Sequence, residues 1–111
     1  NEMKTINRTA IIIIPKQPYI DWADSFNDVK VYYKEAVTTI LIPDEYDEFN
    51  CEKFIKKTYK QIFEEQLESW MADPDVWPKK RNYKMFKRWF DVLCSDMTWD
   101  YGDGDIEHEE Y

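Results

Sequence analysis

Apolar residues recur with two different periods along this chain, and the changes of period divide it into strands and helices. The β-branched block at residues 8–15 (RTAIIIIP) predicts a buried strand that stops at its proline, which has no backbone donor for a sheet. A second apolar run at residues 37–43 (VTTILIP) predicts another strand that ends in the same way. Alternating apolar and polar positions over residues 92–101 predict a third strand.

Three other segments have the period of a helix: residues 18–26, 50–72 and 82–91. In the longest one the apolar positions lie on one arc of the helix and the charged positions lie on the opposite arc. The apolar positions of this segment are Ile55, Tyr59, Ile62, Phe63, Leu67 and Trp70. We expect Asn50 and Asn82 to cap the second and third helices.

These elements predict an α+β fold, with a small sheet of about three strands and three helices packed on one face. The stretch from Val29 to Tyr33 fits either a hairpin strand or an irregular crossover, and we favour the crossover. We expect residues 1–101 to form a single domain. Residues 102–111 are acidic and predict a disordered C-terminal tail.

Composition supports a folded domain, and the charge is unevenly distributed. The 111 residues include 5 Trp, 6 Phe and 8 Tyr, which is ample core material. The net charge is −8, but six acids lie between Asp100 and Tyr111, so the remaining chain carries only about −2. The overall acidity is therefore mostly a property of the tail and says little about the domain.

The only two cysteines, Cys51 and Cys94, lack the spacing of a zinc site or a redox pair. We favour two reduced, buried thiols over the alternative of a disulfide, because a secreted domain of this size usually carries more cysteines. No signal peptide or membrane span is evident. These features predict a cytoplasmic protein that has no membrane partner.

No constellation of residues predicts a reaction, a metal or a cofactor. His108 is the only histidine, which argues against a Ser-His or Cys-His nucleophile. The alternating acids near it resemble a calcium loop, but their glycines are misplaced and no helices flank them. We therefore predict no catalytic residue, cofactor or metal, and we favour a non-enzyme.

The leading hypothesis is a protein-interaction or regulatory module, acting as a homodimer or with a protein partner. Both faces of the last strand are partly apolar, and exposed apolar patches mark partner sites. The expected contact residues are Met97, Trp99 and Tyr101, with a separate basic patch formed by Lys79, Lys80 and Arg81. Nucleic acid is a disfavoured partner of this patch, because the acidic tail would oppose it.

The alternative is a small-molecule binder or a minor hydrolase with a pocket around Gln66. This amide falls in the middle of the apolar arc of the long helix, so it must be paired. It can either pin a loop or strand end or form the polar floor of a pocket. The other pocket residues would be Asp21, Trp22, Trp70 and Trp77.

Three segments carry a resemblance to a known group of proteins. They are QPYIDW at residues 17–22, TILIP at residues 39–43 and EEQLESWMADPDVWPKKRNYKMFKRWFDV at residues 64–92. Over residues 8–101 the chain resembles a family of small uncharacterised bacterial proteins. The resemblance implies a bacterial cytosolic protein and assigns no activity, cofactor or site residue.

Overall fold

The structure, a computed structural model, describes residues 4–26 and 36–110. Its elements in chain order are β1 (Lys4–Thr5), β2 (Arg8–Pro15), α1 (Gln17–Asp24), β3 (Thr38–Pro43), α2 (Cys51–Glu68), the 3₁₀ turn η2 (Pro74–Val76), α3 (Tyr83–Trp89), β4 (Phe90–Ser95) and β5 (Trp99–Asp100). The predicted α+β class is confirmed. The expected crossover at residues 29–33 lies outside the described residues.

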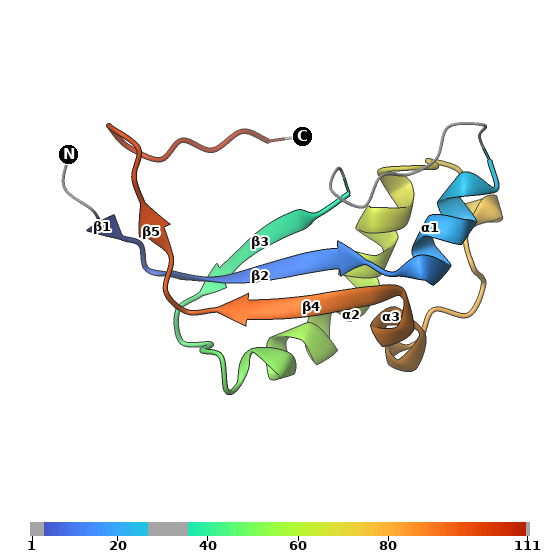
Figure 1. Ribbon diagram of the computed structural model, residues 1–111, viewed down its shortest axis with the longest axis horizontal. Helices are drawn as coiled ribbons and strands as arrows, with labels where there is room; N and C mark the ends of the chain where they lie inside the picture. The colour runs from blue at the N-terminus through green and yellow to red at the C-terminus, as the bar shows by residue number, and fades with distance from the viewer. Residues whose placement is uncertain (1–3, 27–35, 111) are drawn as a thin grey trace.

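The central sheet has the order β3-β2-β4, and both neighbours run antiparallel to β2 (Figure 1). Ile11 is paired with Ile40 on one side and with Cys94 on the other. The β-branched block therefore forms the middle strand, where a continuous apolar run is best buried. Beyond the Arg8 end, β1 and β5 pair as a separate two-stranded ribbon.

The hydrophobic core lies between the sheet and the helices. Helix α2 crosses behind the sheet in Figure 1, while α1 and α3 lie at the Pro15 end. Phe63 of α2 is fully buried, and its ring lies 5.5–5.9 Å from those of Phe86, Trp89 and Phe90. Such aromatic pairs add to the stabilisation from apolar burial alone. This cluster joins α2, α3 and β4 into one core.

The last strand differs from the sequence prediction, which placed one strand over residues 92–101. β4 begins two residues earlier, and β5 is a separate strand. Ala10 pairs with Ser95 but Thr5 pairs with Trp99, so one strand advances five residues while the other advances four. The ladder is therefore interrupted between these two pairs, and β1 and β5 form a separate two-stranded sheet.

Both asparagines occupy the expected N-cap positions of α2 and α3, but only Asn82 caps its helix through its side chain. The Asn82 side chain accepts a hydrogen bond from the Met85 N–H at 2.8 Å. The Asn50 side chain instead accepts from the Asp47 N–H at 2.6 Å, within the turn that precedes α2. An asparagine side chain can accept a hydrogen bond from the backbone of the helix that follows it or of the turn that precedes it, and Asn50 accepts from the turn.

The expectation of two reduced thiols is also wrong, because Cys51 and Cys94 form a disulfide. Cys51 is the first residue of α2, and Cys94 lies on β4, with 6.7 Å between their Cα atoms. The packing of α2 on β4 brings them together, although they are 43 residues apart in the sequence. The spacing of cysteines along a chain does not reveal such proximity.

Candidate functional site

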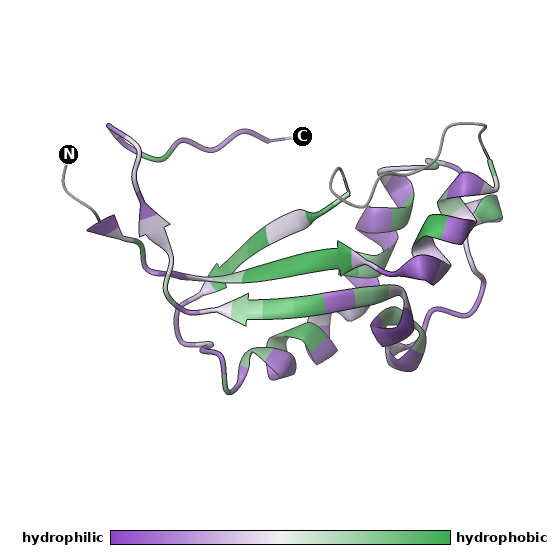
Figure 2. Ribbon diagram, viewed as in Figure 1, coloured by the Kyte–Doolittle hydropathy of each residue, from purple (hydrophilic) through white to green (hydrophobic). Residues whose placement is uncertain are grey.

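The face of the sheet opposite α2, called the outer face below, is apolar along its centre. The odd-numbered residues of β2 are buried against the helices, so its even-numbered residues occupy the outer face. Figure 2 shows β2 as a continuous hydrophobic strand at the centre of the sheet, with α2 behind it. The outer-face positions with apolar side chains are Ala10, Ile12, Ile14, Leu41 and Leu93.

Among the described strand residues, the charged positions of the outer face lie at its two ends. Arg8 is exposed at the start of β2, and Asp91 of β4 is paired in register with Ile14 near the other end. The Asp91 carboxylate lies 3.7 Å from the Lys16 amino group, and its side chain remains 63% exposed. Six residues of a strand span about 20 Å. The outer face thus carries an arginine at one end and, at the other, a largely exposed carboxylate that pairs with Lys16.

The three predicted contact residues lie in the segment that continues from β4. Met97, Trp99 and Tyr101 are exposed, as are Leu41 and Leu93 of the outer face, each with 47–69% of its surface accessible. A set of large apolar side chains at this exposure is typical of an interaction surface. Their exposure meets the requirement for partner binding, and their role stays a prediction.

Four basic side chains line a hollow of about 450 Å³ beside α3, called the basic hollow below. They are Lys79, Lys80, Lys84 and Arg88, and Pro78, Asn82 and Met85 complete its wall. None of the described residues that line this hollow carries a carboxylate. None of the four cations forms an ion pair with another residue in the described ranges. The predicted patch of Lys79, Lys80 and Arg81 did not include Lys84 and Arg88, although their spacing of four residues places them on one helix face.

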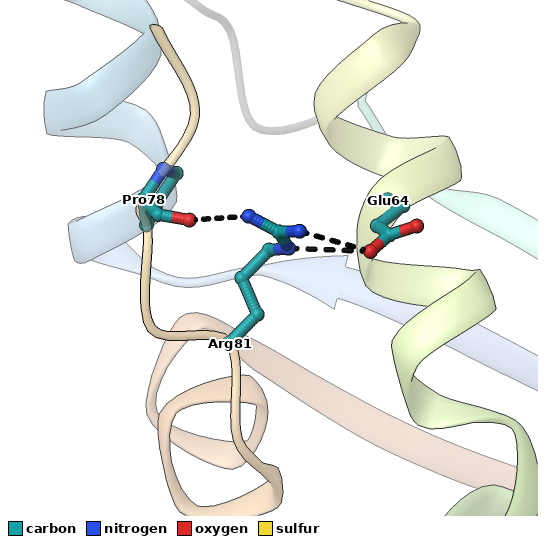
Figure 3. Close-up of polar contacts among 3 residues, drawn as sticks. All are labelled: Glu64, Pro78 and Arg81. Carbon is teal, nitrogen blue, oxygen red and sulfur yellow. Dashed lines mark hydrogen bonds and ion pairs between the residues drawn. The ribbon is translucent and has the colours of Figure 1, made fainter. Parts of the chain in front are cut away.

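Arg81 does not share this hollow, contrary to its grouping with Lys79 and Lys80 in the sequence. Its guanidinium donates to the Glu64 carboxylate at 3.1 and 3.3 Å and to the Pro78 carbonyl at 2.7 Å (Figure 3). It also lies 5.7 Å from the ring centre of Trp77. Arg81 therefore ties the loop before α3 to α2 and leaves the lysines free to face solvent.

Gln66 pins the start of β3, which is the first of its two predicted roles. Its buried side-chain amide lies 3.2 and 3.3 Å from the Thr38 hydroxyl. Its backbone carbonyl accepts from the Tyr19 hydroxyl at 2.8 Å. Because its polar groups already have protein partners, nothing in its surroundings calls for a ligand. The pocket hypothesis stays a prediction.

The other predicted pocket residues hold α1, α2 and η2 together. The three indole N–H groups of Trp22, Trp70 and Trp77 donate to backbone carbonyls at 2.7–3.0 Å. Asp21 is exposed and accepts from the Gln17 side chain at 2.8 Å. Each of the three tryptophans therefore links two segments of the chain through its indole hydrogen bond, and Asp21 forms no such link.

One phenol has a strongly shifted pKa. Tyr83 donates to the Glu52 carboxylate at 2.8 Å, which links α3 to the first turn of α2. Partial burial and this hydrogen bond raise the pKa of Tyr83 to about 12. The same bond, with Lys56 nearby, lowers the pKa of Glu52. The raised pKa keeps Tyr83 protonated and the lowered pKa keeps Glu52 ionised at neutral pH. Neither group therefore changes its protonation state near pH 7, and the contact is structural.

Two further hollows lie elsewhere on the surface of the described residues. One hollow is lined by Ile106 and His108 together with Leu41 and residues 5–8. The other is lined by the disulfide with neighbours from α2 and β4. Over residues 4–26 and 36–110, no helix is long and apolar enough to cross a membrane. The same residues contain no cluster of three potential metal ligands.

Comparison with protein-family models, with curated proteins and with solved structures finds no match for this chain. The resemblance to a family of bacterial proteins therefore stays a prediction. The outer face and the basic hollow are the two surfaces of the described residues that offer a binding function.

Proposed function

We propose that this chain is a protein-interaction module that self-associates through the outer face of its sheet. The observation that carries the proposal is the apolar outer face, which lies on the side of the sheet away from α2 (Figure 1). On it Ala10 is buried and Ile12 and Ile14 are half-buried. Leu41 and Leu93 stand on either side of β2 with about half of their surfaces exposed. Burying such side chains contributes roughly 1.5–3 kcal/mol each.

The charges at the ends of this face support a second copy as the partner. In a two-fold dimer the same patch meets itself, so it must be self-complementary. When two outer faces meet with antiparallel strands, Arg8 of one copy lies near Asp91 of the other, and the contact occurs twice. Charges arranged in this way favour one orientation over others more than they add affinity.

The proposal is tested by light scattering coupled to size-exclusion chromatography over a range of concentrations. We expect a dimer whose dissociation constant rises at least about tenfold for Leu93→Asp, because a buried unpaired charge is costly. Phe49→Asp is the matched control, since Phe49 is 88% exposed in the loop before α2. A monomer at all concentrations, or equal effects of the two substitutions, would refute self-association through this face.

A charge exchange tests the orientation. Arg8→Glu and Asp91→Arg should each weaken the dimer, and the double substitution should restore it. Additive weakening in the double variant would contradict the antiparallel arrangement while leaving the face itself in place.

Two cellular locations, the cytoplasm and an oxidising compartment, are compatible with the proposed function. A cytoplasmic location is a prediction from the sequence alone. The Cys51–Cys94 disulfide favours an oxidising compartment, because disulfides persist there and are rare in the cytosol. Counting free thiols in protein purified under alkylating conditions distinguishes the two.

A further inference from the structure

The basic hollow is a concentration of positive charge in a chain that is negative overall. Lys79, Lys80, Lys84 and Arg88 surround it, whereas the whole chain carries −8. All four side chains are exposed, and none of them forms an ion pair with a carboxylate of the described residues. A hollow lined by one sign of charge concentrates ligands of the opposite sign.

The chain itself contains a segment of opposite charge. Residues 100–110, called the acidic segment below, carry six carboxylates and no lysine or arginine. Residues 101–110 are exposed and form neither helix nor strand. Their side chains are therefore available to a partner.

The spacing of charges in the two surfaces is compatible. Lys84 and Arg88 are one helical turn apart, which separates them by about 6 Å along α3. Asp103, Asp105, Glu107 and Glu109 alternate, and alternate residues of an extended chain lie on one side about 7 Å apart. An extended acidic segment can therefore place successive carboxylates opposite successive cations.

Within one copy the acidic segment and the basic hollow lie toward opposite edges of the sheet. The acidic segment runs on the β3 side, whereas α3 lies on the β4 side (Figure 1). Ile106 and His108 share a hollow with Leu41 of β3. We propose that the basic hollow binds the acidic segment of a second copy of this chain. The binding surface of this contact is the basic hollow and not the outer face, although the acidic segment of each copy lies beside Arg8 and Leu41 of its own outer face.

The direct test uses a fluorescent peptide with the sequence of residues 101–111. The receptor is the full-length chain in which the carboxylates at 103, 105, 107, 109 and 110 are converted to amides. Fluorescence anisotropy should show saturable binding that weakens as salt rises, since exposed ion pairs are screened. Converting the four cations of the basic hollow to glutamine should weaken binding roughly tenfold or more, as expected for the loss of several exposed ion pairs.

A matched control removes basic side chains elsewhere. Lys53, Lys57 and Lys60 are exposed on α2 and do not line the basic hollow. Their triple conversion to glutamine should leave peptide binding within about twofold, because pairs beyond a Debye length are screened. If the control variant weakened peptide binding equally, the effect would come from the overall charge of the chain, and the proposal that the basic hollow is the binding site would be wrong. An amidated peptide that binds equally well would also overturn it.

Two further measurements decide the occupant. At nanomolar protein, the unmodified chain should bind the peptide as tightly as the amidated chain does. A weaker affinity would mean that the acidic segment fills the hollow of its own copy, which overturns binding between copies. If a single-stranded RNA of equal length displaces the peptide at lower concentration, the hollow is a nucleic-acid site and the proposal is wrong. Because the peptide does not involve the outer face, its failure to bind leaves the dimer test unaffected.

Discussion

The disulfide between α2 and β4 gives a prediction whose magnitude follows from its position in the chain. It closes a loop with a sequence separation of 43 residues. In the chain-entropy treatment, removing a cross-link over such a loop costs about 4 kcal/mol, because the unfolded chain regains conformational freedom. Domains of this size have unfolding free energies of about 5–15 kcal/mol. Loss of the disulfide should therefore remove a large fraction of the total stability.

The measurement is urea unfolding, followed by tryptophan fluorescence, of oxidised protein, reduced protein and the double variant Cys51→Ala/Cys94→Ala. Reduced protein keeps the sequence constant, so its comparison with oxidised protein isolates the cross-link. An open hollow at the disulfide allows a small reductant to reach it. The slope of free energy against urea should also rise on reduction, because the unfolded chain exposes more surface.

Two results would refute this reasoning. Free-thiol titration of freshly purified, alkylated protein that finds two thiols would show that the bond is not formed. Equal urea midpoints for oxidised and reduced protein would show that the cross-link does not restrict the unfolded chain as calculated.

Three further predictions concern contacts between elements. Thr38→Val leaves the buried Gln66 amide unpaired and should lower the free energy of unfolding by about 1–3 kcal/mol in urea; adding Gln66→Leu should recover part of the loss. Tyr83 should titrate near pH 12 in absorbance at 295 nm, and Glu52→Gln should lower that pKa by removing the neighbouring charge. Since the folded pKa lies above the ordinary value of 10.0, the stabilising contribution of Tyr83 is complete below pH 10 and is lost toward pH 12. Arg81→Ala breaks a partly exposed ion pair and should cost at most about 1 kcal/mol in the same urea assay.

Each of these has an outcome that contradicts it. An unchanged urea midpoint in Thr38→Val would mean that the amide finds another partner. A tyrosine titration that is the same with and without the Glu52 charge would place the shifted phenol elsewhere. A loss of several kcal/mol in Arg81→Ala would mean that the Arg81 contact is far better shielded from water than its exposure indicates.

The sequence by itself determined the features that depend on neighbouring residues. The β-branched block and its closing proline defined β2, because side-chain period and the missing proline donor act within a few residues. The long amphipathic pattern defined α2, with its apolar arc in the core. The Asn82 cap was predictable for the same reason, since its bond reaches only three residues along the chain. The paired state of Gln66 also followed from its position on the helix.

Tertiary structure alone decided the features that join distant segments. The Cys51–Cys94 bond, the Arg81–Glu64 contact and the β1–β5 ribbon connect residues 17 to 96 positions apart. No local pattern encodes such pairings, because they depend on which faces meet once the core has formed. The outer face and the basic hollow also depend on how the elements pack against one another. The sequence contained the lysines and the apolar residues, but only the packing of α2 behind the sheet set the outer face on the opposite side and drew Arg81 away from the basic hollow.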